Sequence, residues 1–209
     1  MEAVSFKEQQ FKVREDLIVV AANRLLATKG FDLMTMDDVA TAVGVSKGIL
    51  YKHFASKETL AAAAMVQVLR GALAAIEALP AEQPAIAKLK AALAWTLQAR
   101  LAGGVPLLPS SSPNLQRSLF SSPGYTAAAF RMNHVIGSLV HEAVAQGHLR
   151  GDVPAEVVVN SLYSRTCDPA FDLLRATGRY TDDQLIEHLV SLCFDGLTTR
   201  GGLALTRAA

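Results

Sequence analysis

The sequence predicts an all-helical protein, and three observations support that fold class. Apolar residues make up 51% of the 209 residues, whereas aromatic residues contribute only 6%. The apolar positions recur at steps of three and four residues, which is the period of an amphipathic helix. The alternation of apolar and polar residues that marks a half-buried strand is nearly absent. We therefore expect helices along the chain, joined by turns that contain glycine and proline.

Charge and cysteine content place few limits on the function. The net charge is +1, so it indicates neither a polyanionic nor a polycationic partner. Cys167 and Cys193 lack the spacing of a metal site or a CxxC motif and are expected to be small buried hydrophobes. The chain starts without an apolar signal core, and no uninterrupted apolar run reaches the ~18 residues that span a bilayer. A cytoplasmic protein without a membrane partner is the simplest expectation.

A short helix is predicted over 35–43. Thr35 is a suitable N-cap, and Asp38 follows three residues later at the spacing of a capping box, with Asp in place of the usual Glu or Gln. Asp37 and Asp38 also lie at the positive end of the helix dipole. One face is apolar, because it carries Met36, Val39, Ala40 and Val43. Gly44 follows where the end of a helix favours a left-handed residue.

A second helix is predicted over 47–53, with Ser46 as its N-cap. Leu50 and Phe54 lie four residues apart, so they share one face and are expected to point inward. The outward face then carries Lys47, Gly48, Tyr51 and Lys52. Since a glycine has no side chain, the backbone at Gly48 can approach a phosphate or a base edge closely.

Two short helices joined by a glycine turn form a helix-turn-helix, which lays its second helix into the major groove of DNA. Residues 44–57 carry three lysines, one histidine and no acid, although residues 1–59 hold eight Lys and Arg against eight Asp and Glu. The positive charge is thus concentrated at one edge, which favours docking at a specific site. The alternative is an ordinary helical hairpin with a solvated basic rim. The caps, the turn glycine and the aromatic Tyr51 favour the DNA-binding interpretation.

The segment from Val13 to Leu60 resembles the N-terminal domain of the TetR/AcrR-type repressors. Ile18, Ala22, Leu25 and Leu26 are similar to the core residues of that family's first helix. Gly30-Phe31 is similar to the loop that follows the family's first helix. The most specific similarity is found in Gly44-Val45-Ser46-Lys47-Gly48, Leu50-Tyr51-Lys52-His53-Phe54 and Ser56-Lys57-Glu58. The resemblance covers roughly a quarter of the chain. It implies a DNA-binding domain over 1–58 and a larger helical effector-binding and dimerisation domain over 59–209.

The resemblance also implies roles for single residues. The residues expected near base edges are Lys47, Gly48 and Tyr51, and those expected on phosphates are Tyr51, His53 and Lys57. The family usually carries threonine where this chain has Ile49, which cannot donate a hydrogen bond; Ile49 either contacts a thymine methyl or is buried. The full predicted DNA-binding set is Thr35, Ser46, Lys47, Gly48, Ile49, Tyr51, Lys52, His53 and Lys57.

Beyond the motif, the spacing of apolar residues predicts helices over 58–79, 84–101, 114–120, 125–146, 154–177 and 181–199. Pro169 is expected to kink the helix over 154–177. Residues 102–124 are rich in Gly, Pro and Ser, which indicates loops on both sides of a short helix. In the resembled family this region holds the entrance to the effector pocket; the alternative is a surface loop without that role.

Contacts with an effector and with a second subunit are predicted from residue type and position. Candidate effector contacts are Trp95, Phe120, Tyr125, Phe130, His134 and Tyr163. The alternative for each is a structural role, and Trp95 in particular can be an anchor of the core. The last two helices are too apolar to stay exposed, and in the resembled family the matching pair forms a four-helix bundle with its symmetry mate. Candidate dimer contacts are Val158, Leu162, Leu185, Leu189 and Cys193.

The chain carries no glycine-rich phosphate loop, no HExxH and no GxSxG motif, so no enzyme, cofactor or metal is expected. The sequence predicts a homodimeric repressor that leaves a pseudo-palindromic operator in double-stranded DNA when a small, largely apolar effector binds. A DNA-binding dimer that takes no effector is the first alternative. A helical enzyme or carrier is the second. Whether the protein represses or activates depends on the position of its operator.

Overall fold

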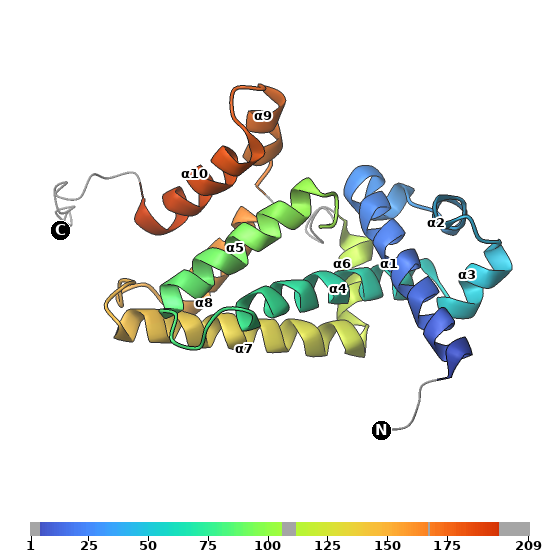
Figure 1. Ribbon diagram of the computed structural model, residues 1–209, viewed down its shortest axis with the longest axis horizontal. Coiled ribbons are helices and arrows are strands. Elements are labelled where there is room, and N and C mark those ends of the chain that lie inside the picture. Colours follow the sequence, from blue (N-terminus) through green and yellow to red (C-terminus); the bar gives the residue numbers. More distant parts are fainter. Residues whose placement is uncertain (1–4, 106–111, 167, 197–209) are drawn as a thin grey trace. The chain divides into compact units, whose positions relative to one another are not determined.

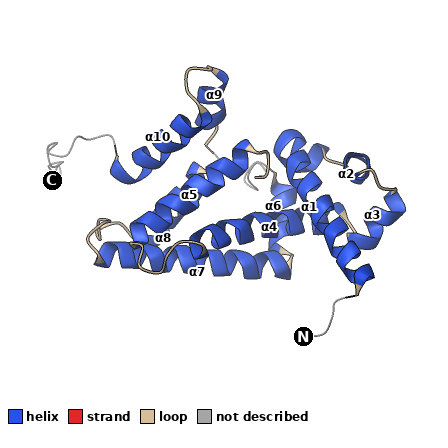
Figure 2. Cartoon of the chain, in the orientation of Figure 1, coloured by secondary structure: helices blue, strands red, loops and turns tan. Residues whose placement is uncertain are grey.

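The computed structural model describes residues 5–105, 112–166 and 168–196, and every regular element in these ranges is a helix (Figure 1). Figure 2 shows the helices in blue, joined by tan turns and loops. The predicted fold class is therefore confirmed. The chain divides into two compact units, residues 1–167 and 168–209, and each is described by itself.

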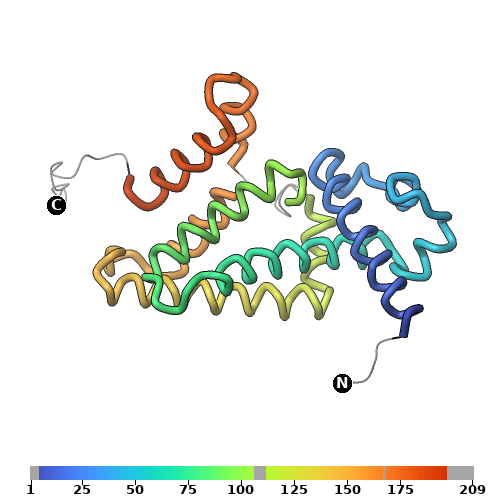
Figure 3. The backbone as a smooth tube through the Cα atoms, viewed as in Figure 1, coloured from blue at the N-terminus to red at the C-terminus, as the bar shows by residue number. Residues whose placement is uncertain are grey.

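The chain path is followed by its colours in Figure 3. The helices of the first unit are α1 (Phe6–Leu33), α2 (Met36–Val43), α3 (Lys47–His53), α4 (Lys57–Glu77), α5 (Ala85–Leu101), α6 (Pro113–Phe120), α7 (Pro123–Ala145) and α8 (Ala155–Arg165). Those of the second unit are α9 (Ala170–Ala176) and α10 (Asp182–Asp195). We call α1 to α3 the head and α4 to α8 the body. In the body, α4, α5 and α7 pack against one another, and α8 packs on α7.

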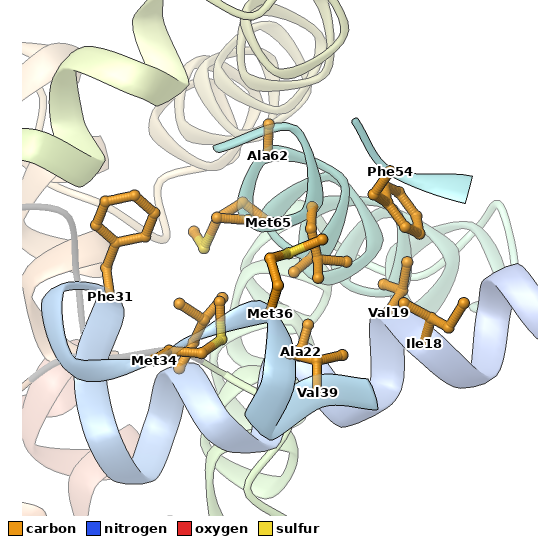
Figure 4. Close-up of a cluster of buried hydrophobic side chains, with 14 of the residues drawn as sticks. Ile18, Val19, Ala22, Phe31, Met34, Met36, Val39, Phe54, Ala62 and Met65 are labelled. Carbon is orange, nitrogen blue, oxygen red and sulfur yellow. The ribbon is translucent and has the colours of Figure 1, made fainter. Parts of the chain in front are cut away.

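The head is closed around one hydrophobic core, shown with its side chains in Figure 4. Its most deeply buried members in the head, each at most 1% exposed, are Ile18, Ala22 and Leu26 of α1, Met34 between α1 and α2, Val39 of α2 and Leu50 of α3. The start of α4 completes this core with Leu60, Ala61, Ala64 and Met65. The apolar faces predicted for the two short helices are thus the faces that the structure buries. Leu25 and Val43 are only partly buried against the same core.

Helix α6 of the body also reaches this core. Leu115 and Leu119 are 2% and 1% exposed and belong to the same cluster as the head residues. The Nδ2 of Asn114 donates a hydrogen bond to Asp32 Oδ1 at 3.2 Å, which ties the start of α6 to the end of α1. That hydrogen bond is the main cause that lowers the pKa of the Asp32 carboxyl. A displacement of α6 therefore disturbs the packing of the head.

Helix α4 is the one described helix that is long and apolar enough to cross a membrane by length and composition. Its most apolar window of 18 residues has a mean hydropathy of 1.6, and 44% of that window is buried inside the structure. It packs against α1, α5, α6 and α7. Those contacts make α4 the central core helix. A buried core helix has the same apolar composition as a helix that spans a membrane.

Two expectations about the last helices are wrong. The segment over 154–177 is not one kinked helix, because α8 ends at Arg165 and α9 begins at Ala170. Pro169 lacks the backbone N–H of a helix interior and instead precedes α9, whose Ala170 N–H donates to Asp168 Oδ1 at 2.9 Å. The final helix ends at Asp195 rather than near residue 199, and Gly196 follows with a φ of 74°. Cys167 and residues 197–199 lie outside the described part.

Trp95 of α5 lies directly against the backbone of α4 at Gly71. A Cβ added at Gly71 would stand 2.4 Å from Cη2 and 2.5 Å from Cζ2 of the indole. No unstrained contact is that short, so Gly71→Ala must push the ring aside. We expect a net loss of about 1–2 kcal/mol in the free energy of unfolding. Overpacking costs about 1–3 kcal/mol, and the higher helix propensity of alanine offsets up to about 1 kcal/mol of that cost. Urea denaturation measures this loss.

Gly137 of α7 supplies the matched control for that prediction. A Cβ added there meets nothing within 4 Å, so Gly137→Ala carries the same gain in helix propensity without a clash. We expect it to stabilise the protein by about 0.5–1 kcal/mol. Equal changes in stability for the two variants would contradict the close packing of Trp95 on α4.

Candidate nucleic-acid interface

Local hydrogen bonds set the start of each helix in the helix-turn-helix. The Thr35 hydroxyl accepts from the Asp38 N–H at 3.1 Å, and the Asp38 carboxylate accepts from the Thr35 N–H at 3.0 Å, which confirms the capping box. Lys29 of α1 donates to Asp38 at 2.7 Å, and this hydrogen bond is the largest cause that lowers the pKa of Asp38 to about 2. The Ser46 hydroxyl accepts from the Ile49 N–H at 3.3 Å and caps α3 as predicted.

The turn between α2 and α3 depends on Gly44. Its φ of 74° and ψ of 34° are left-handed, a conformation that only glycine adopts without a steric cost. The N–H of Val45 then donates to the Ala40 carbonyl at 3.0 Å, which closes the end of α2. The turn presents α3 with Leu50 and Phe54 directed into the head core, at 0% and 7% exposure. The opposite face of α3 is left to the solvent.

That outer face carries the residues expected to meet DNA. Lys47, Gly48, Tyr51 and Lys52 are all exposed, and the Tyr51 residue keeps 44% of its surface accessible. A Cβ added at Gly48 would meet nothing within 4 Å, so the packing of the free protein does not require a glycine there. The open surface at Gly48 leaves room for close approach by a partner. We call Lys47, Gly48, Tyr51 and Lys52 the α3 outer face.

Lys47 is paired within the free protein, which the sequence reasoning missed. Its Nζ lies 2.8 Å from Asp37 Oδ1 and 3.0 Å from Oδ2, across the turn from α3 to α2. The hydrogen bond and the charge of Asp37 raise the pKa of Lys47. Both side chains are exposed, so the pair is screened by water and exchanges readily. A phosphate must therefore compete with Asp37 for this lysine.

Asp37→Asn is expected to tighten binding to the operator by about two- to fivefold. The change frees Lys47 and removes a negative charge beside the DNA backbone, each of which is worth a few tenths of a kcal/mol at an exposed site. Titration of labelled operator DNA measures the change in Kd. Glu82→Gln makes the same change of charge in the exposed connection between α4 and α5 and is expected to leave the Kd unaltered. Weaker binding by Asp37→Asn would contradict the competition.

His53 and Lys57 are placed differently from the expectation that they contact phosphates. The His53 side chain is 2% exposed and stacks on Phe11 of α1, with the ring centroids 3.9 Å apart. Its buried Nδ1 has no hydrogen-bond partner within the described chain and lies 3.9 Å from Glu15. Lys57 donates to the Phe31 carbonyl at 3.0 Å and lies over the Phe31 ring. In this structure His53 therefore holds α3 against α1, and Lys57 holds the start of α4 against the end of α1.

The remaining predicted DNA contacts have structural tasks or an intermediate position. Thr35 and Ser46 act as caps, although both stay exposed at the surface. Ile49 is half-buried, so it is neither a core residue nor a fully exposed one.

The six candidate effector residues do not converge on one pocket. Phe120 and Phe130 are 65% and 77% exposed, and His134 is exposed as well. Tyr125 packs beside the head core, with its ring in edge contact with Phe120. On α7, outward residues could not be separated from inward ones by sequence alone, because that helix carries apolar residues on more than one face.

Trp95 and Tyr163 line two different cavities. The cavity at Tyr163 lies inside the body, has a volume of about 40 Å³ and is bounded by α4, α5, α7, α8 and the turn that follows α8. The Tyr163 hydroxyl donates to Asn133 Oδ1 at 2.9 Å, and burial raises the pKa of Tyr163 to about 12. We call this the body cavity. Trp95 instead lines a larger cavity between the head and the body. Part of the expected entrance, residues 106–111, lies outside the described ranges.

The candidate dimer contacts are mostly buried within the chain itself. Leu162, Leu185 and Leu189 are 8%, 2% and 9% exposed, so these three offer little surface to a second subunit. Val158 and Cys193 are half-buried. The second unit instead exposes Leu173 and Leu192, at 70% and 44%.

No group of three or more His, Cys, Asp or Glu side chains gathers as a metal site in the described ranges.

Comparisons with known sequences agree with the head. The family model for bacterial regulatory proteins of the tetR family matches residues 18–64. The uncharacterised HTH-type transcriptional regulator YerO of Bacillus subtilis strain 168 is 43% identical over 47 residues, which are 22% of this chain and 16% of YerO. The chain thus spans less than a fifth of that relative. A second uncharacterised regulator from the same strain, YvaF, is 26% identical over 186 residues, or 87% of this chain and 94% of YvaF.

Solved structures with the same fold include three regulators. The ketosteroid regulator KstR2 of Mycobacterium tuberculosis matches 90% of this chain and 96% of its own, with a TM-score of 0.65 and 20% identity. AibR, in complex with isovaleryl coenzyme A and operator DNA, matches 87% and 98%, with a TM-score of 0.61 and 19% identity. FadR from Bacillus subtilis, in complex with stearoyl-CoA, matches 88% and 99%, with a TM-score of 0.63 and 15% identity. At these identities the likeness shows the fold.

Proposed function

Because the chain belongs to the TetR family of bacterial transcriptional regulators, we propose that it is a repressor which a small, largely apolar effector releases from its operator. The observation that carries this proposal is the α3 outer face, which is exposed, basic and aromatic while the inner face of α3 is locked into the head core. A helix held in this way docks into the major groove without further folding.

We further propose that the protein acts as a homodimer. One α3 reads only a few base pairs, whereas two copies related by two-fold symmetry read two half-sites about one helical turn apart. The exposed Leu173 and Leu192 of the second unit are suited to an apolar contact between subunits. The buried Leu185 and Leu189 leave little surface for that contact.

Leu192→Arg is expected to convert the dimer to a monomer at micromolar concentration, because an unpaired charge in an apolar interface is costly. Light scattering after size-exclusion chromatography measures the mass. Glu187→Arg places the same side chain at another exposed position of α10 and serves as the control. If Leu192→Arg stays dimeric, Leu192 lies outside the interface.

The packing of α6 provides a way for effector binding in the body to change the position of the head. Leu115 and Leu119 are part of the head core, and Asn114 is bound to Asp32 of α1. Helix α6 also packs on α7, which supplies Asn133 as the partner of Tyr163 beside the body cavity. A ligand that spreads α7 from its neighbours therefore shifts α6, and with it the head. A preference of a few kcal/mol between two head positions changes operator occupancy strongly.

The body cavity sets limits on the effector. Its walls are almost entirely apolar, with Leu93, Met132 and Ile136 among them, and Tyr163 supplies a polar group. At about 40 Å³ it holds no more than a few water molecules, so an effector must widen it. The AibR and FadR complexes contain acyl-CoA thioesters. Acyl-CoA thioesters, whose acyl chain is the small apolar part that would enter this cavity, are therefore the first compounds to test.

Binding of the protein to DNA tiled from the region upstream of its own gene tests the proposal. We expect tight binding at one site with a two-fold-symmetric footprint, and release when isovaleryl-CoA or stearoyl-CoA is added. Site-limited binding that no effector relieves would favour a DNA-binding dimer without an effector. Weak binding that is equal on all tiles would contradict the expectation that the operator lies in this region. It would also show that the α3 outer face recognises no specific sequence there.

A further inference from the structure

A cavity lies where α1, α4 and α5 meet, at the junction of the head and the body. Its volume is about 330 Å³, which is within the range of ~300–1,000 Å³ that small-molecule sites occupy. Its apolar walls come from Val20 of α1, Val68 of α4, and Trp95 and Ala99 of α5. None of its lining residues is shared with the body cavity. We call it the junction cavity.

Polar groups of the junction cavity are only partly satisfied by the protein. Asn23 is 3% exposed, and its Nδ2 donates to Gln67 Oε1 at 2.9 Å. The Oδ1 of Asn23 is buried and has no hydrogen-bond partner in the described chain. Such an atom is uncommon in native proteins and calls for a reason. The Asn23 and Gln67 amides form the polar floor of a cavity whose other walls are apolar.

A cation stands at the rim of the same cavity. Arg24 is exposed and lines the cavity, and within the described ranges its guanidinium makes no hydrogen bond or ion pair. The Gln67 amide likewise has no acceptor for its N–H groups there. An arginine fork beside an amide donor is suited to a carboxylate, because hydrogen bonds between charged partners are about twice as strong as neutral ones.

We propose that the junction cavity binds a small aromatic carboxylate that also carries a hydroxyl group. The ring packs on the indole of Trp95, the carboxylate takes hydrogen bonds from Arg24 and Gln67, and the hydroxyl donates to Asn23 Oδ1 once that amide turns toward the cavity. Such a ligand contacts α1 of the head and α4 and α5 of the body at the same time. This inference goes beyond the proposed function, because it concerns a second site and its binding test needs no operator.

Trp95 makes the binding directly measurable. It is the only tryptophan of the chain and forms part of the cavity wall, so its fluorescence reports on the cavity. The probe is 4-hydroxyphenylacetate, titrated into the full-length protein without DNA. We expect a saturable change in tryptophan emission. The amide 4-hydroxyphenylacetamide, which lacks the negative charge, is expected to bind about tenfold more weakly, and phenylacetate, which lacks the hydroxyl, a few-fold more weakly.

Two arginine variants distinguish this cavity from any other place of binding. Arg24→Gln keeps much of the side chain but removes the charge, and we expect its Kd for the probe to rise about tenfold. Arg14→Gln makes the same change ten residues earlier on α1, outside the cavity, and its Kd should equal that of the wild type. No saturable change in emission, or equal binding by Arg24→Gln and the wild type, would overturn the proposal. Neither result depends on whether an operator has been found.

Discussion

Replacing Tyr51 and Lys52 together by alanine is expected to raise the operator Kd by about a hundredfold or more. Contacts of this kind are each worth about 1–3 kcal/mol, and the proposed two-fold-symmetric dimer would lose them at both half-sites. The fold should be unaffected, because Tyr51 is 44% exposed and Lys52 has no hydrogen bond or ion pair in the described chain. Operator titration gives the Kd, and thermal unfolding should show a stability within about 0.5 kcal/mol of the wild type.

Lys88→Ala is the control for that double variant. It removes the same charge from the first turns of α5 in the body, away from the head, and should leave the operator Kd unchanged. Equal losses for the two variants would mean that net charge, and not the α3 outer face, governs the binding. An unchanged Kd in the double variant would remove α3 from the interface.

Leu50→Ala is expected to lower the free energy of unfolding by about 2–5 kcal/mol. Leu50 is 0% exposed and lies in the core that α1, α2, α3 and α4 share, so truncation leaves a cavity that these helices cannot all close. DNA binding should fall as a consequence, because α3 loses the contact that holds it at a fixed angle. Denaturation in urea measures the loss of stability.

Leu33→Ala gives the matched comparison. Leu33 is the last residue of α1 and is 74% exposed, so the same truncation should change stability by no more than about 0.5 kcal/mol. A loss for Leu50→Ala as small as that for Leu33→Ala would show that the head core does not depend on the inner face of α3.

The sequence predicted the helix-turn-helix almost to the residue because its determinants are local. Thr35 with Asp38 and Ser46 with the Ile49 N–H lie three residues apart, and the left-handed Gly44 is required by the turn itself. Caps and turn glycines need no knowledge of distant contacts. The inward direction of Leu50 likewise follows from helical periodicity.

The positions of His53 and Lys57 could not be predicted in the same way. Their partners are Phe11 and the Phe31 carbonyl, which lie 42 and 26 residues away along the chain and meet them only once α1 crosses the motif. Side chains that share a periodic pattern look alike in sequence, whether a distant helix covers them or leaves them exposed. The assignment of Trp95 and Tyr163 to one effector site failed for the same reason. In the structure these two side chains line two different cavities.

The pair between Lys47 and Asp37 changes what a salt titration of DNA binding reports. A free lysine that meets a phosphate releases about one bound cation from DNA, and these releases set the slope of log K against log salt. If Lys47 contacts a phosphate as proposed, it must leave Asp37, and the exposed carboxylate then attracts a cation in its place. The net release at this contact is close to zero. The slope of log K against log salt will therefore indicate fewer phosphate contacts than a footprint shows. In Asp37→Asn the slope should become steeper and agree with the footprint.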